Sequence, residues 1–73
     1  MKRKKITPQM LLDLFDRGVV IHQAWIMPGS YWEYTVNRVG ETTRNPSIAT
    51  RHSLLAAYNA AIRHLEAVTH ETQ

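Results

Sequence analysis

The sequence contains no cysteine, few glycines and no long hydrophobic run. Without cysteine it can form neither disulfide bonds nor cysteine-ligated zinc sites, a composition compatible with the cytoplasm. The longest apolar runs, residues 19–21 and 24–27, are far too short to cross a bilayer. Residues 2–5 resemble the charged start of a signal peptide, but Asp13 and Asp16 interrupt the apolar segment that should follow. We therefore expect a cytoplasmic protein without a membrane partner.

Residues capable of catalysis or metal binding form no known motif. The three glycines, Gly18, Gly29 and Gly40, are scattered, so no glycine-rich loop can hold a phosphate group. No serine lies in a Gly-x-Ser-x-Gly elbow. His64 and His70 are too far apart in sequence to share a helical face, as two residues four apart would. We expect no enzyme activity, no cofactor and no metal site.

The positive charge is confined to the N-terminus. The chain has a net charge of +3, but residues 2–5 supply +4, and the remaining five arginines and six acids sum to −1. Such a segment either binds phosphate groups non-specifically or only improves solubility, and both interpretations stay open. We expect a basic flexible tail over residues 1–5 and a single domain over residues 6–73. The candidate nucleic-acid contacts are Lys2, Arg3, Lys4, Lys5 and Arg51.

Residues 19–39 are predicted to form a β-hairpin. Trp32, Tyr34 and Val36 alternate with polar residues, which is typical of a strand with one buried face. A loop of two or four residues pairs Trp25 with Trp32, whereas a three-residue loop shifts the register by one and exchanges the two faces. Proline followed by glycine suits type I or II turns, which splay a two-residue hairpin. We therefore predict the four-residue loop 27–30, with Ile26 opposite Tyr31 and Ile21 opposite Val36.

In this register one face of the hairpin is apolar except for Gln23 and is expected to form the core. The face comprises Val19, Ile21, Trp25, Trp32, Tyr34 and Val36. Its tryptophans and Tyr34 could instead stack on nucleic-acid bases, but an apolar stripe on the last helix favours the core assignment. The predicted core therefore joins Trp25, Trp32, Tyr34 and Val36 to Leu54, Tyr58, Ile62 and Leu65, together with Leu11 and Phe15.

Two helices are predicted to flank the hairpin. The first covers residues 8–17, because Thr7 can cap it, Pro8 suits the first helical position and Gly18 favours a helix end. The second begins at Ser47 or, preferably, Thr50. Its buried stripe comprises Leu54, Leu55, Tyr58, Ala61, Ile62, Leu65 and Val68. Whether residues 41–44 form a short third strand is left open.

The predicted architecture is a two-layer α+β domain with helices on one face of a small antiparallel sheet, in the order α-β-β-(β)-α. This order and the alanine-rich last helix resemble the double-stranded-RNA-binding domain in topology. That family carries a lysine cluster at the start of its last helix, whereas residues 50–55 here hold one firm charge. Its first hairpin loop usually carries a histidine, and residues 27–30 contain none. The resemblance therefore implies the fold and not the RNA-binding function.

The overall profile also resembles small accessory proteins of bacteriophages and mobile elements, many of which bind a host protein. We therefore expect a non-enzymatic protein that docks onto another protein as an inhibitor or adaptor; a homodimer is a further possibility. Nucleic-acid binding through the basic tail is the alternative. The predicted interface is the sheet face that the helices do not cover, with an apolar residue beside a tyrosine at its centre. Its residues are Val20, Ala24, Ile26, Tyr31 and Val39.

Overall fold

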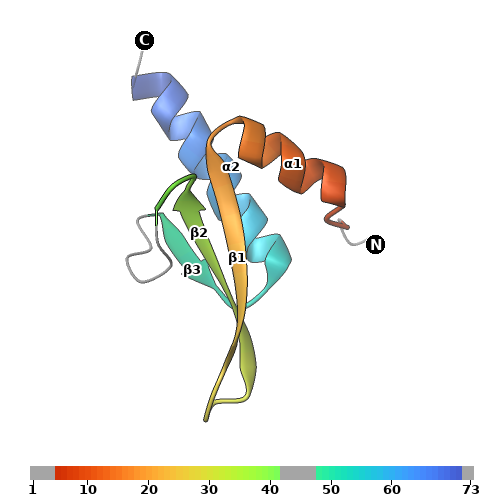
Figure 1. Ribbon diagram of the computed structural model, residues 1–73. Helices are drawn as coiled ribbons and strands as arrows, with labels where there is room; N and C mark the ends of the chain where they lie inside the picture. The colour runs from red at the N-terminus through yellow and green to blue at the C-terminus, as the bar shows by residue number, and fades with distance from the viewer. Residues whose placement is uncertain (1–4, 42–47, 72–73) are drawn as a thin grey trace, which may run out of the picture.

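The structure is a computed structural model that describes residues 5–41 and 48–71. Its elements are α1, Pro8–Asp16; β1, Val19–Ile26; β2, Tyr31–Arg38; β3, Ala49–Arg51; and α2, Leu54–Glu71. The strands form one antiparallel sheet in the order β1-β2-β3, and α2 packs across one of its faces (Figure 1). The predicted α+β class is confirmed, with the third strand present. Within these two ranges no helix is long and apolar enough to span a bilayer.

Helix α1 forms where the sequence predicts it. Thr7 is the N-cap: its side-chain oxygen accepts a hydrogen bond from the backbone N–H of Met10, at 3.3 Å. Pro8 occupies the first helical position, where its missing N–H removes no intrahelical bond. Gly18 has a φ of +91°, the left-handed conformation that glycine adopts at little cost after a helix. The chain can therefore turn directly from α1 into β1.

The hairpin register is the predicted one. Trp25 lies opposite Trp32, Ile26 opposite Tyr31, and the loop comprises residues 27–30. The loop conformation differs in one respect, since the Met27–Pro28 peptide bond is cis rather than the trans form of a type I or II turn. Because side chains alternate along a strand, Trp25 and Trp32 point to the same face of the sheet as Val19 on β1 and Val36 on β2.

The third strand lies later in the sequence than residues 41–44, the segment for which a strand was left open. It is Ala49–Arg51, paired with residues 34–36 of β2. Of residues 41–44, the structure describes only Glu41, which is not in a strand. Thr50, the preferred helix cap, lies inside β3, because pairing with β2 holds this segment extended. The other predicted cap, Ser47, lies outside the described residues.

Helix α2 is capped by Ser53, three residues after the preferred start. The Ser53 hydroxyl accepts a hydrogen bond from the Ala56 backbone N–H at 3.1 Å, and its carbonyl accepts one from Ala57 at 3.0 Å. Serine and threonine are comparably good caps. The helix therefore starts at the first good cap after β3 ends.

The core lies between α2 and the sheet, with α1 packed against β1. Its buried side chains are Leu14, Val19, Val36, Ala57, Ala61 and Leu65. Partly buried neighbours extend it, namely Leu11, Ile21, Tyr34, Ile48, Ala49, Tyr58 and Ile62. The predicted helix-2 stripe therefore contributes through Ala61, Leu65, Tyr58 and Ile62, whereas Val68 is exposed.

Three large side chains of the predicted core are exposed. Trp25 is 48% exposed, Trp32 46% and Phe15 51%. The two tryptophans are on the predicted face of the sheet, but β3 pairs only with residues 34–36 and the hairpin continues beyond it. Figure 1 shows this end of β1 and β2 projecting away from both helices. Placing both tryptophans in the core was therefore wrong because alternation specifies a face and not what covers it.

The opposite face of the sheet is also less exposed than predicted. Thr35 and Asn37, two of the polar residues that alternate with Tyr34 and Val36, are 7% and 0% exposed. Both belong to β2, the central strand, which is flanked by β1 over its length and by β3 beside Thr35. In the middle of this face, the β2 side chains therefore have little exposed surface for a partner to contact.

The difference in burial predicts different mutational costs. Leu14→Ala should destabilise the protein by about 2–5 kcal/mol, because Leu14 is 1% exposed and its removal leaves a cavity. Trp32→Ala should cost less than Leu14→Ala, because Trp32 is 46% exposed and its removal leaves no enclosed cavity. Urea unfolding of both variants measures the difference. A Trp32→Ala loss as large as that of Leu14→Ala would place the hairpin end in the core.

Capping predicts a second difference. Ser53→Ala should cost about 0.5–2 kcal/mol, because it removes the hydrogen bond to the Ala56 N–H. Thr50→Ala removes no helix cap and should cost less. Thermal unfolding of the two variants in parallel measures this. A larger loss for Thr50→Ala would place the cap before β3.

Candidate functional site: the apolar end of the hairpin

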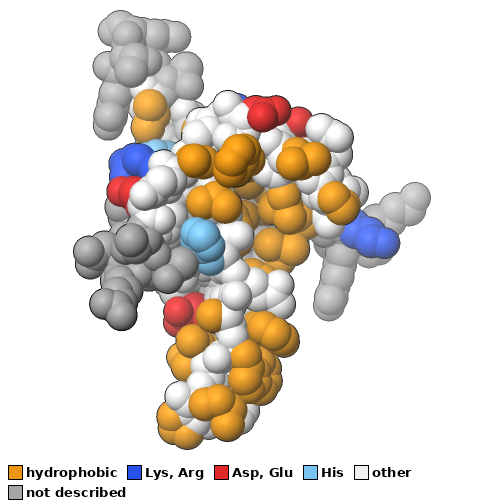
Figure 2. All heavy atoms as spheres, viewed as in Figure 1, with side chains coloured by type: hydrophobic (Ala, Val, Ile, Leu, Met, Phe, Trp, Pro, Cys, Tyr) orange, Lys and Arg blue, Asp and Glu red, His pale blue; other side chains and the backbone are white. Residues whose placement is uncertain are grey.

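Four exposed large apolar side chains gather at the projecting end of the β1–β2 hairpin, residues 25–32, which we call the arm tip. Each strand has eight residues and is therefore about 27 Å long, whereas β3 covers only three positions of β2. In Figure 2 apolar side chains dominate the lower end of the molecule, which this tip forms. The arm tip therefore combines protrusion with apolar character.

Two indole rings and a thioether give the arm tip most of its apolar area. The rings of Trp25 and Trp32 meet edge to face, with centroids 5.1 Å apart and planes inclined at 65°. This is a favoured geometry for aromatic pairs, so each ring restricts the other. Met27, in the loop, is 68% exposed. The face that carries the two indoles and the adjoining loop are therefore apolar.

Tyr31 occupies the other face of the arm and is held in place from two sides. Its ring lies 4.9 Å from the ring of His52, measured between centroids. On the loop side the ring packs so closely over Gly29 that an added Cβ there would collide with it. Ile26, its cross-strand neighbour, is partly buried. The arm tip is thus apolar on both faces, with the hydroxyl of Tyr31 as a polar group.

The arm tip carries no formal charge. From Gly18 to Trp32 the sequence contains no aspartate, glutamate, lysine or arginine, and Glu33 is the first charged residue after it. Depletion of charge together with tryptophan, tyrosine and methionine is the composition of the buried centre of protein interfaces. The absence of charge over residues 18–32 is visible in the sequence. The assignment of both tryptophans to the core did not take it into account.

The predicted interface residues do not form one patch. Ile26, Tyr31 and the exposed Ala24 lie at or beside the arm tip. Val20 is six residues away along β1, about 20 Å, and lines a groove against α1. Val39 is 45% exposed and lies at the other end of the hairpin, where its N–H donates to the Gly18 carbonyl. The structure therefore brings three of the five residues together.

A second apolar surface lies between α1 and β1. It is an open groove of about 410 Å³. Its lining residues are Pro8, Leu11, Leu12, Phe15, Val20 and Ile21. Leu12 and Phe15 are 58% and 51% exposed, and Figure 2 shows apolar side chains along this side of the molecule. The chain therefore has a convex apolar surface at the arm tip and a concave one beside α1.

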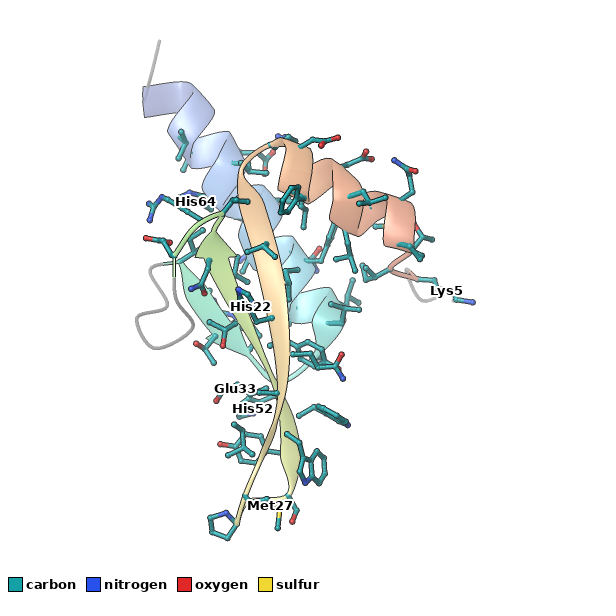
Figure 3. All side chains as sticks on the ribbon, in the orientation of Figure 1. Lys5, His22, Met27, Glu33, His52 and His64 are labelled. Carbon is teal, nitrogen blue, oxygen red and sulfur yellow. The ribbon has the colours of Figure 1, made fainter. Side chains whose placement is uncertain are left out.

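Lys5 and the described histidines His22, His52 and His64 lie in different parts of the fold. Figure 3 shows Lys5 near the start of α1, His22 on β1, His52 near the arm and His64 on α2. Among the described residues no three histidine or acidic side chains are arranged to hold a metal ion. Arg51 is exposed on β3, while residues 2–4 of the predicted nucleic-acid set lie outside the described residues.

Comparisons with protein-family models, with curated proteins and with solved structures give no match to this chain.

The edge-to-face tryptophan pair should stabilise the arm independently of the core. In a double-mutant cycle with Trp25→Ala and Trp32→Ala, we expect a coupling free energy of about 0.5–1.5 kcal/mol. Urea unfolding of the four proteins supplies the values. A coupling of zero would mean that the two rings do not stay in contact in solution.

Proposed function

We propose that this chain is a small, non-enzymatic binding protein that docks onto another protein as an inhibitor or adaptor, and that the arm tip makes the central contact. The observation that carries the proposal is the exposure of Trp25, Trp32, Met27 and Tyr31 on an uncharged projection. We place the encounter in the cytoplasm, with which a cysteine-free sequence is compatible.

The apolar area of the arm tip is large enough to support binding. A tryptophan buries roughly 150–250 Å² when fully covered, so a half-exposed indole can still bury roughly 100 Å². At about 25 cal/mol per Å², each ring then contributes about 2–3 kcal/mol of transfer free energy. Because the two rings already restrict each other, little further side-chain entropy is lost on binding. The pair therefore has the properties of an interface hot spot.

The charge distribution favours a protein over a nucleic acid at this site. Aromatic residues that stack on bases are normally combined with a positively charged groove that follows the phosphate backbone. The arm tip contains no cation, and the nearest charged residue in sequence is Glu33. Nucleic-acid binding through Lys2, Arg3, Lys4 and Lys5 remains a separate alternative, in which affinity falls steeply with salt.

The partner we propose is a different protein with an uncharged apolar groove. A groove of this kind can enclose both faces of the arm, the indoles on one side and Ile26 with Tyr31 on the other. A strongly charged groove would have to lose hydration without gaining an ion pair, which disfavours it. The homodimer is the competing arrangement, in which the arm of one copy enters the α1–β1 groove of another.

Two matched variants separate these arrangements. The arm variant carries Trp25→Asp and Met27→Asp, and the groove variant carries Leu12→Asp and Phe15→Asp; all four positions are about half exposed or more. Partners are captured with the wild type, purified and re-measured against each variant. The arm variant should lose at least about 100-fold in affinity, because it removes two anchors. The groove variant should bind as the wild type does.

Sedimentation of the same three proteins tests the competing arrangement. The proposal expects a wild type that stays monomeric over the concentrations used for binding. A dimer that both variants dissociate would instead show self-association between arm and groove. Retention of the purified partner by the arm variant would contradict the proposed contact. Loss of binding only on deletion of residues 2–5 would favour the basic tail.

A further inference from the structure

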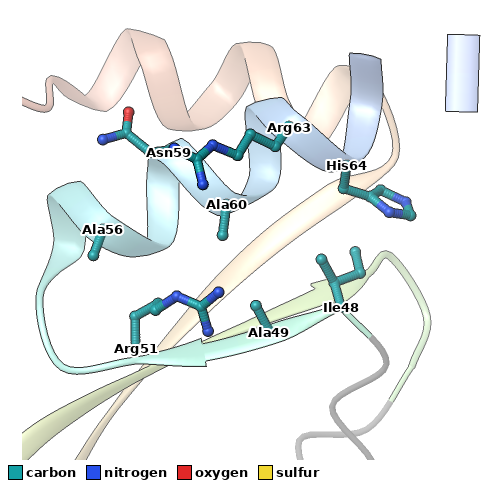
Figure 4. A pocket seen from close by; sticks show the side chains of 8 residues that line it. All are labelled: Ile48, Ala49, Arg51, Ala56, Asn59, Ala60, Arg63 and His64. Atoms are coloured by element: carbon teal, nitrogen blue, oxygen red, sulfur yellow. The ribbon is translucent and has the colours of Figure 1, made fainter. Parts of the chain in front are cut away.

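A second, chemically different hollow lies on the helix-covered side of the sheet, between β3 and α2. Its volume is about 450 Å³, within the range of small-molecule sites. Ala49 on β3 and Ala56 and Ala60 on α2 line it, and their small side chains leave the space open. Figure 4 shows these methyl groups between the two elements. The hollow is therefore built from both elements and has an apolar floor.

The rim of this hollow carries two guanidinium groups, the Asn59 amide and the His64 imidazole, and no carboxylate. Arg51 extends from β3 and Arg63 from α2, and Figure 4 shows both guanidinium groups over the same opening, with Asn59 beside them. Among the described residues neither arginine is in an ion pair. Arg38 and Glu41, which do form one, do not line the hollow. Arg51 donates one hydrogen bond, from Nη1 to the Thr50 carbonyl at 2.8 Å. Most of the ten guanidinium N–H groups are therefore available to a ligand.

Two like charges on the walls of one hollow favour an anion between them. A carboxylate has two coplanar oxygens and is satisfied by one guanidinium. A phosphate monoester has three terminal oxygens arranged tetrahedrally and a charge of about −1.5 to −2 at neutral pH. It can therefore accept hydrogen bonds from two walls at once and balance both positive charges. The space is also much larger than one phosphate group, and the alanine floor suits an apolar body.

We propose that this hollow binds a small organic phosphate monoester, with Arg51 and Arg63 holding the phosphate group and the three alanines contacting the apolar part of the ligand. This site is separate from the arm tip and does not depend on the docking proposed above.

Phenyl phosphate is the probe that tests the site, because it combines a dianionic phosphate with a compact apolar ring. We expect it to shift the backbone amide resonances of residues 49–51 and 56–64 in a two-dimensional NMR titration at low salt. Arg51→Gln and Arg63→Gln should each weaken binding at least about tenfold, since hydrogen bonds between charged groups are lost. Both side chains are exposed, so neither change should alter the melting temperature appreciably.

Arg17→Gln is the matched control, because it removes the same charge at the C-cap of α1 and away from the hollow. It should leave the affinity for phenyl phosphate within about twofold of the wild type. Equal losses in all three variants would show that only net charge matters and would overturn the site. The arm variant should bind phenyl phosphate normally, which keeps this test independent of the arm.

Three further ligands define the chemistry. Benzoate and inorganic phosphate should each bind more weakly than phenyl phosphate, because one lacks the tetrahedral dianion and the other the apolar body. Benzoate binding as tightly would overturn the phosphate assignment, and inorganic phosphate binding as tightly would overturn the role of the floor. A single-stranded oligonucleotide that binds more tightly than phenyl phosphate through Arg51 and Arg63 would replace the small ligand with nucleic acid.

Discussion

Two alanines of α2, Ala57 and Ala61, are completely buried against the sheet face that carries Val36, and the rest of the structure depends on this contact. Side chains this small allow the helix to approach the strands closely, so Leu14 and Leu65 can close the core around the same point. The contact also sets the extent of the core. The helix begins just after β3, whose three residues pair with the middle of the hairpin, and β1 and β2 continue beyond that level. The exposed arm therefore follows from strands that are longer than the part of the sheet that the helix covers.

The hairpin was predictable because the information that determines it is local. Loop length and alternation within residues 19–39 were enough to place Trp25 opposite Trp32, and the cap at Thr7 and the glycine at position 18 were enough to bound α1. The third strand and the start of α2 were not predictable in this way. Thr50 and Ser53 are equivalent caps by residue type, and the choice between them depends on pairing with β2, a contact distant in sequence. The prediction that the tryptophans are buried was wrong for the same reason, since their burial depends on where β3 and α2 lie along the hairpin.

The candidate site was predictable in part. The register placed Ile26 beside Tyr31 at the end of the hairpin, and the structure keeps them there. The indoles on the other face share the alternation of Ile21 and Val36, so that pattern alone assigns them to the core. The absence of charge from Gly18 to Trp32 distinguishes the arm from an ordinary solvated hairpin end. The hollow beside β3 had no such signal, because Arg51 and Arg63 are brought together only by the packing of a strand against a helix.

Folding alone does not account for the composition of the arm. Replacing Met27 by a polar residue would not destabilise the core, because this side chain is 68% exposed and lies beyond the helix-covered part of the sheet. The pairing of Trp25 with Trp32 stabilises the hairpin, but smaller β-branched residues can pair across strands as well and would expose less apolar area. Uncharged apolar surface on a projection also promotes non-specific association, which soluble proteins usually limit with charged residues. Keeping two indoles, a thioether and a phenol there, with no charge among them, therefore has a cost that burial against a partner would offset.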